Sequence, residues 1–321
     1  MKKIVLWIVV GLVVLLLAAY LGVGYMVYDK FSKIVPFDER AENTPADFEI
    51  IYDNVGPFDT TPYLMPDYEE VSFSSRDPKI TLAGWYIPGD EGAPAVVVTH
   101  GIGAAKYAGN ILTIAGMLHK SGFNVLMFDL RNHGLSSKDD GRTSIGNREY
   151  KDVLGAWDYL INERGFDPTR VGVFGLSLGG ASTLDAFAEE PRIAAAMVDS
   201  PFSDLQQVIS EELVRNDYPT LLAPACILTA RLIGGVDLLE HSPQDAILKN
   251  AGRPLYIVHG LVDERINVHH SRDLVALADE KGVAVQAWYV EGADHVCAEF
   301  VAPEEYEQKM ASFYRQALEG D

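Results

Sequence analysis

The fold of this 321-residue chain is decided by the stretch RVGVFGLSLGG, residues 170–180. A short apolar run leads directly into a G-x-S-x-G pattern around Ser177, and an alanine-rich segment of helical character follows. In a strand–turn–helix context this pattern sets a serine hydroxyl on a sharp turn, and the flanking glycines allow close backbone packing. The stretch therefore predicts that Ser177 is a nucleophile. The structural alternative is a glycine-rich turn with an incidental serine.

Apolar segments of strand length alternate with helix-length segments on both sides of this stretch. Near-continuous Val, Ile, Leu and Phe runs are typical of parallel strands that are covered on both faces. The alternation predicts an α/β fold with a doubly wound, mostly parallel sheet. We predict strands at 95–99, 124–128, 170–174, 194–198, 255–259 and 284–290, and helices near 107–121, 147–164, 178–189, 267–281 and 303–318. Before them, near-alternating apolar residues predict an antiparallel hairpin that turns at 76–79.

One interval breaks this rhythm, because more than fifty residues separate Val198 from Leu255. Two helical segments near 203–216 and 219–234 predict a small cap, spanning about 200–250. The second segment is apolar almost all round, and we expect Pro224 to bend or break it. Three roles are open for its apolar residues: lining an acyl pocket, packing only within the protein, or touching a bilayer. These residues are Leu221, Leu222, Ile227, Leu228, Leu232 and Ile233.

A serine hydroxyl needs a general base, and His295 is the best candidate. It follows the predicted strand 284–290, so its loop lies at the carboxyl edge of the sheet, the same edge as Ser177. His133 is the strongest competitor, since its loop also lies at that edge. His269 and His270 fall at the start of a predicted helix, where capping or solvent exposure is expected.

The base in turn needs an acid that orients its ring. Asp263 follows the predicted strand 255–259 and reaches the same edge. Glu264 and Asp294 are the alternatives, although Asp294 is adjacent to His295 and neighbouring side chains on an extended segment usually diverge. Ser177, Asp263 and His295 then occur in the Ser–acid–His chain order that accompanies the G-x-S-x-G turn.

Backbone donors for an oxyanion are predicted at two places. The N–H of Leu178, the residue after the nucleophile, supplies one of them. The loop His100-Gly101-Ile102-Gly103-Ala104 follows the predicted strand 95–99, and its glycines allow a substrate to approach the backbone closely. We assign the second donor to the N–H of Ile102, with a plain glycine-rich turn as the alternative.

From about residue 68 to 318 the chain resembles the α/β-hydrolase superfamily. It is most similar to bacterial membrane-anchored hydrolases related to the prolyl-oligopeptidase-like and serine-aminopeptidase-like groups. The resemblance implies Ser177, Asp263 and His295 as the triad and an oxyanion loop at 100–103. One departure is Asp77-Pro78, where relatives commonly have Asp-Gly in the hairpin turn. The motifs that carry the resemblance are His100-Gly101, the segment 129–136 (DLRNHGLS), the segment 175–180, Asp199-Ser200-Pro201-Phe202, the segment 259–263 and Asp294-His295.

The N-terminus predicts a membrane anchor. Lys2 and Lys3 precede an uncharged apolar run over 4–28, which exceeds the ~20 residues that span a hydrocarbon core of ~30 Å. We expect an uncleaved, single-pass transmembrane anchor at 1–28, a tether at 29–66 and an α/β-hydrolase domain at 67–321. A cleaved signal peptide is the alternative. The two lysines favour an extracytoplasmic catalytic domain at the cell membrane, although Lys30 and Lys33 weaken this asymmetry.

Composition narrows the partners and the chemistry. A formal net charge of −20 disfavours nucleic acid as a partner. We expect no metal or organic cofactor, because the sequence has no H-E-x-x-H, phosphate loop or dinucleotide fingerprint. Cys226 and Cys297 form no C-x-x-C motif, so buried thiols are favoured and a single disulfide is left open.

The sequence as a whole predicts a serine hydrolase that cleaves carboxylic esters through an acyl-enzyme. We expect a small-molecule or lipid-like ester substrate with an apolar acyl group. The alternatives are a membrane-anchored serine peptidase and a non-catalytic binding protein on the same scaffold.

Overall fold

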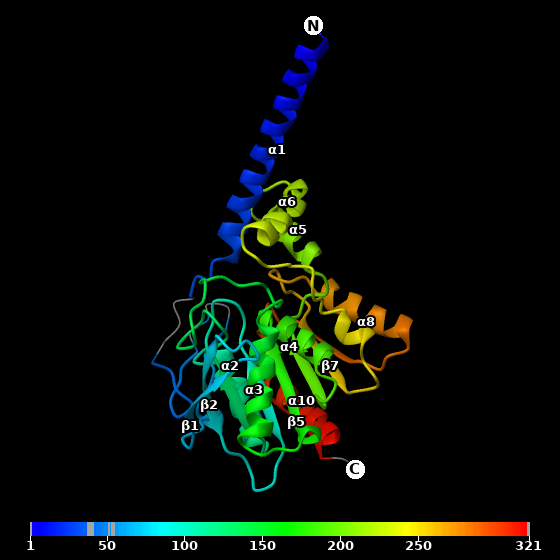
Figure 1. The fold of residues 1–321 in the computed structure, drawn as a ribbon. Coiled ribbons are helices and arrows are strands. Elements are labelled where there is room, and N and C mark those ends of the chain that lie inside the picture. Colours follow the sequence, from blue (N-terminus) through cyan, green and yellow to red (C-terminus); the bar gives the residue numbers. More distant parts are fainter. Residues whose placement is uncertain (1, 37–41, 51, 53–54, 320–321) are drawn as a thin grey trace. The chain divides into compact units, whose positions relative to one another are not determined.

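The computed structural model describes residues 2–36, 42–50, 52 and 55–319. The chain forms two compact units, which are described separately (Figure 1). The sheet unit comprises residues 34–204 and 241–321, and the helical unit comprises residues 1–33 and 205–240.

The sheet unit is built around one eight-stranded sheet with the order β1-β2-β4-β3-β5-β6-β7-β8. β1 and β2 form an antiparallel hairpin, β2 also pairs antiparallel with β4, and all remaining pairs are parallel. The predicted hairpin and mostly parallel sheet are therefore confirmed. The strands are β1 (Glu69–Ser74), β2 (Thr81–Ile87), β3 (Ala95–Thr99), β4 (Asn124–Phe128), β5 (Val171–Leu176), β6 (Ala195–Asp199), β7 (Leu255–Gly260) and β8 (Gln286–Val290).

Helices cover both faces of this sheet (Figure 1). Val96 and Val98 of β3 pack into the core on one face, while Ala95 and Val97 pack on the other, as the two-residue period of a strand requires. The doubly wound arrangement is thus confirmed. One face carries α2 (Gly109–Lys120), α9 (Ala298–Val301) and α10 (Pro303–Leu318), and the other carries α3 (Tyr150–Asn162), α4 (Leu178–Glu189), α7 (Asp245–Leu248) and α8 (His269–Lys281).

The segment that leads into the sheet is packed rather than loose. Phe48 and Met65 are buried in the same core cluster as α2, and so is Tyr63 of the 3-10 turn η1 (Thr61–Tyr63). A second 3-10 turn, η2 (Pro168–Arg170), precedes β5. Part of the predicted tether at 29–66 lies outside the described residues, at 37–41, 51 and 53–54.

The helical unit contains α1 (Lys2–Ser32), α5 (Leu205–Arg215), the 3-10 turn η3 (Thr220–Leu222) and α6 (Ala223–Leu232). α1 packs closely on α6, because a Cβ on Gly24 would lie 2.5 Å from the Cβ of Ala225. Helices are present in both of the segments where they were predicted, as α5 and α6. The second segment is divided next to Pro224 into η3 and α6, and this proline lies in the first turn of α6, where a missing N–H costs no helical hydrogen bond.

Candidate active site

Ser177 occupies a strained turn between β5 and α4. Its φ is +52°, which is uncommon for a residue with a side chain. The turn is tight because a Cβ on Gly175 would overlap the backbone of Gly179, and a Cβ on Gly179 would overlap the carbonyl of Thr99. Glycine at both positions lets the helix start directly above the strand, and the partly exposed serine is left at the carboxyl edge of the sheet.

Three side chains from separate loops meet at this edge. The Nε2 atom of His295, after β8, lies 2.9 Å from the Oγ of Ser177. The Nδ1 atom of the same ring lies 2.8 Å from the Oδ2 of Asp263, after β7. The structure therefore brings together the serine, the histidine and the carboxylate that the sequence predicted, in one continuous chain of hydrogen bonds.

Asp263 is held as a buried carboxylate. Its Oδ1 accepts the backbone N–H groups of Arg265 and Ile266, both at 2.8 Å. Burial raises the pKa of Asp263, but hydrogen bonds from His259 and His295 lower that pKa more, so it falls well below its usual range. The group is consequently an anion that can fix the His295 ring.

His259, at the end of β7, is a second partner of Asp263 that the sequence analysis missed. Its Nε2 lies 3.2 Å from the Oδ2 of Asp263 and 2.8 Å from the carbonyl of Ile266. Its Nδ1 lies 2.6 Å from the Oγ of Ser271. The sequence did contain a sign of this role, because His259 is a polar residue in an otherwise apolar, buried strand and such a residue needs hydrogen-bond partners.

Of the two alternative acids, Asp294 holds the backbone of these loops. Oδ1 of Asp294 accepts the N–H groups of Glu264 and His295, at 3.2 and 2.7 Å. Glu264 itself is exposed. Asp294 therefore links the loop after β7 to the loop after β8, and this link helps to hold the Asp263 and His295 side chains next to each other.

The oxyanion loop after β3 approaches Ser177 closely. A Cβ on Gly101 would lie 3.4 Å from the Cβ of Ser177. Among the described residues, the N–H groups of Ile102 and Leu178 have no hydrogen-bond acceptor. Both predicted donors are thus free to bind an oxygen, whereas the N–H of Gly103 is already bonded to the Nε2 of His133 at 3.1 Å.

His133 supports this loop rather than the serine. Its Nδ1 lies 2.8 Å from the carbonyl of Arg131, so with Nε2 accepting from Gly103 the ring is neutral. His100 behaves likewise, with its Nε2 accepting from Leu130 and its Nδ1 bonded to Gly101. Burial lowers the pKa of both histidines, and that of His100 falls to about 3 because His133 is also close.

A buried ion pair fixes the far end of the same loop. The Nζ of Lys106 lies 2.7 Å from the Oδ2 of Asp129, and neither side chain is more than 3% exposed. Oδ1 of Asp129 also accepts the backbone N–H of Lys106, and Oδ2 accepts that of Leu135. The acidic residue of the DLRNHGLS segment therefore ties that segment to the oxyanion loop.

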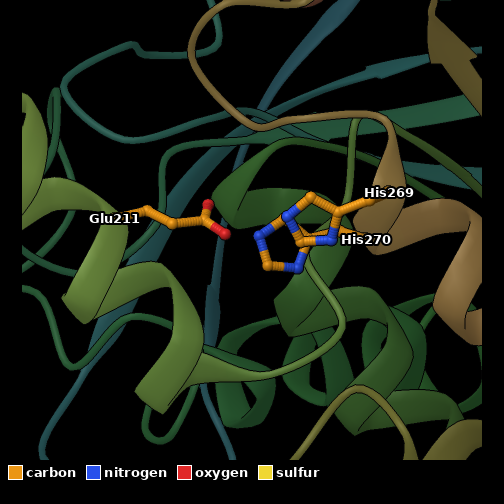
Figure 2. Close-up of side chains that lie close together, drawn as sticks. All are labelled: Glu211, His269 and His270. Atoms are coloured by element: carbon orange, nitrogen blue, oxygen red, sulfur yellow. The ribbon is translucent and has the colours of Figure 1, made fainter.

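The rings of His269 and His270 are in contact at the start of α8, with centroids 4.2 Å apart and planes tilted by 36° (Figure 2). His270 is fully buried and bonds the Oγ of Ser203 at 3.0 Å, so the expected solvent exposure is wrong for this residue. Glu211, the third residue labelled in Figure 2, comes from α5 in the other unit. We infer no metal site from the three side chains.

Both cysteines are buried free thiols, Cys226 in the helical unit and Cys297 in the sheet unit. Burial raises the pKa of Cys226 to about 11, so this thiol is protonated at neutral pH. The buried-thiol interpretation is confirmed.

The chain is similar to several known proteins, an esterase and a peptidase among them. Residues 113–321 match the model of the prolyl oligopeptidase family. An uncharacterized protein of Mycobacterium tuberculosis is 30% identical over 233 residues, which cover 72% of this chain and 74% of the relative. An esterase of Pyrococcus furiosus has a similar structure, with a TM-score of 0.65 and 22% identity over 89% of this chain and 99% of that chain. An acylaminoacyl peptidase of Pyrococcus horikoshii has a TM-score of 0.60 and 18% identity, over 79% of this chain and 42% of that chain.

Proposed function

Because the chain belongs to the prolyl oligopeptidase family, we propose that it hydrolyses carboxylic esters through an acyl-enzyme formed on Ser177. The chain is a serine hydrolase with the α/β-hydrolase fold, as the sequence predicted. The observation that supports an acyl-enzyme on Ser177 is the hydrogen-bond chain from the Oγ of Ser177 through His295 to Asp263.

In the proposed reaction His295 acts first as a base. Its Nε2 takes the proton of the Ser177 hydroxyl as Oγ attacks the ester carbonyl. The imidazolium that forms keeps its Nδ1–H donated to Asp263, whose anion stabilises the positive charge. His295 then gives the proton to the leaving alcohol, and the acyl group remains on Ser177.

The N–H groups of Ile102 and Leu178 would hold the negative oxygen that develops during attack. One such donor contributes about 3 kcal/mol of transition-state stabilisation in enzymes of this kind. In the second half of the cycle His295 removes a proton from water, which attacks the acyl-enzyme carbonyl. His295 then gives this proton to the Oγ of Ser177 as the acyl–Oγ bond breaks and the acid is released. Both proton transfers pass through the Nε2 of His295.

We further propose that the preferred acyl group is apolar. Leu261 and Val262 lie between β7 and Asp263 and are 37% and 53% exposed. Apolar side chains left exposed beside a reactive edge favour an apolar ligand. Each buried CH₂ contributes about 0.8 kcal/mol, so activity should rise over the first few acyl carbons.

We propose that α1 anchors the enzyme in the cell membrane as a single-pass helix. The helix is long and apolar enough to cross a bilayer, with a mean hydropathy of 3.0 over its most apolar 18 residues and none of that window buried. Lys2 and Lys3 favour a cytoplasmic N-terminus and an extracytoplasmic catalytic domain. Protease added to intact spheroplasts should digest the catalytic domain, and protection until lysis would reverse this topology.

The substrate assignment is tested with the full chain in detergent. We expect hydrolysis of p-nitrophenyl esters that rises from acetyl to butanoyl and then falls where the acyl site ends. Ser177→Ala should show no turnover. A flat response from acetyl to octanoyl would contradict the apolar acyl preference. Turnover of aminoacyl amides with no turnover of esters would instead support a peptidase, which the likeness to the acylaminoacyl peptidase makes the second candidate.

A further inference from the structure

We propose that one face of the η3–α6 segment rests on the surface of the lipid bilayer beside α1, so that the helical unit contacts the membrane at two elements. This inference rests on the proposed anchoring by α1. The face, called the α6 face below, comprises Leu221, Pro224, Leu228 and Leu232.

The α6 face is a regular stripe of exposed apolar side chains. Leu221 is 63% exposed, Leu228 43% and Leu232 68%. Pro224, Leu228 and Leu232 are spaced by four residues and so lie on one side of α6, and Leu221 precedes them in η3. The opposite side is buried, through Leu222, Ala225, Cys226, Thr229 and Ala230. The segment thus has one side that packs within the protein and one apolar side without a cover among the described residues.

The charge of the segment also fits a lipid surface. The chain carries a formal net charge of −20, yet residues 219–235 contain no Asp or Glu. Arg231 is their single charged residue, and its Nη1 lies 3.5 Å from the Oδ2 of Asp237 with 68% of the side chain exposed. An apolar face with an arginine beside it is typical of helices that lie in the headgroup region.

The packing of α1 on α6 sets the depth of this face. The hydroxyl of Tyr20 donates to the carbonyl of Leu221 at 2.6 Å, and Gly24 abuts Ala225. At 1.5 Å per residue, residues 4–23 of α1 span about 30 Å, the thickness of a hydrocarbon core. Leu221 is therefore level with the last turn of α1 inside the core, where hydrocarbon meets headgroups.

The far end of α6 is further from the core. A Cβ on Gly234 would overlap the Tyr28 side chain, eight residues along α1 from Tyr20 and about 12 Å further out. The segment thus slopes away from the bilayer, with Leu221 deepest, Leu228 intermediate and Leu232 shallowest. The exposed apolar side chains of α1 extend to Val23 and Met26, next to Gly24, where α6 packs. This proximity is why a bilayer fits the α6 face better than a second copy of the chain does.

The test measures the depth of spin labels on the full chain in vesicles of phosphatidylethanolamine and phosphatidylglycerol. Single cysteines replace Leu221, Leu228 or Leu232, with Leu12→Cys in α1 and Glu280→Cys in α8 as references. The native cysteines are buried, and unsubstituted protein measures their background labelling. Turnover of a soluble ester confirms that each variant is folded. The readout is the ratio of collision rates with oxygen, which partitions into lipid, and with a water-soluble nickel chelate.

We expect the oxygen-to-nickel ratio to fall in the order Leu12, Leu221, Leu228, Leu232, and to be lowest at Glu280. If Leu12 lies in lipid while Leu221 and Leu228 match Glu280, the α6 face does not touch the bilayer and the anchor stands. If Leu12 itself is aqueous, the anchor fails and this inference with it. Dipolar broadening at Leu221 with low access to both reagents would show that a second copy covers the face, which also overturns the proposal.

Discussion

The two units of this protein have different unusual features, buried charged groups in one and a stripe of exposed leucines in the other. In the sheet unit, charged residues such as Lys106, Asp129 and Asp263 are buried, and each is paired or hydrogen-bonded. In the helical unit, leucines such as Leu221 and Leu232 are more than 60% exposed. A preorganised polar network is what catalysis requires, whereas an exposed apolar stripe needs a partner. The contrast is in keeping with the proposals that the sheet unit performs the chemistry and that the helical unit contacts the membrane.

The largest effect is expected from removing the nucleophile or the base. Ser177→Ala and His295→Ala should each lower kcat by about 10⁶-fold, because members of such a group act as a unit. Ester hydrolysis measures the loss, and circular dichroism should show an unchanged fold. If a substitution in the helical unit lowered turnover of a soluble ester as much as Ser177→Ala does, the chemistry would not be confined to the sheet unit.

Replacing the acid should cost less. Asp263→Asn keeps the shape of the side chain but removes the anion that fixes the His295 ring, so we expect kcat to fall by about 10⁴-fold. Glu264→Gln is the matched control, since Glu264 is exposed and the change is of the same kind. If Asp263→Asn left kcat unchanged while Glu264→Gln or Asp294→Asn lowered it strongly, the residue that orients His295 would be Glu264 or Asp294 instead.

The neutral histidines predict how stability depends on pH. Burial lowers the pKa of His133 below its usual value near 6.5, so below pH 6.5 the unfolded chain binds more protons. The contribution of the neutral His133 ring to the free energy of unfolding is fully present above pH 6.5. This contribution is lost as the pH falls toward the pKa of His133 in the folded protein, by at most about 1.4 kcal/mol per pH unit.

Urea unfolding of wild type and His133→Asn isolates this contribution. The loss of unfolding free energy caused by the substitution should be larger at pH 7 than at pH 5. Ser177→Ala, which removes no histidine, should show the wild-type dependence on pH. An equal loss from His133→Asn at both pH values would mean that the ring is not held neutral, and that the oxyanion loop is fixed by other contacts.

The smallest effect is expected from the α6 face. Leu221→Asp combined with Leu228→Asp should leave kcat/KM for a soluble short-chain ester unchanged, while turnover of an ester embedded in vesicles falls severalfold. Leu248→Asp is the matched control, because Leu248 is 53% exposed and belongs to α7 of the sheet unit. If turnover of the soluble ester and of the embedded ester fell equally, α6 would contribute to catalysis itself rather than to contact with the bilayer.

The sequence was most informative where one local pattern carries both structure and chemistry. Gly175 and Gly179 bracket Ser177 because no larger residue fits the turn, so the pattern identifies the turn and the serine together. His295 and Asp263 followed from the rule that loops after parallel strands share one edge of the sheet.

What the sequence did not reveal depends on contacts between distant residues. Lys106 and Asp129 are 23 positions apart, and neither has a local pattern that identifies its partner. Gly24 and Ala225 are separated by most of the chain, so the packing of α1 on α6 could not be anticipated from the composition of either helix. The sequence did not show where the helix around Pro224 begins. The position of this proline in the first turn of α6 could therefore not be predicted.

Labelling with a fluorophosphonate tests the central claim most directly, because this reagent reacts with a serine only when a base activates it. The account predicts that mass spectrometry of the full chain finds one phosphonylated residue, Ser177. Labelling should be lost in Ser177→Ala and reduced by orders of magnitude in His295→Ala. Stoichiometric labelling of Ser177→Ala at another residue, or an unlabelled wild type, would contradict the assignment of Ser177 as the nucleophile.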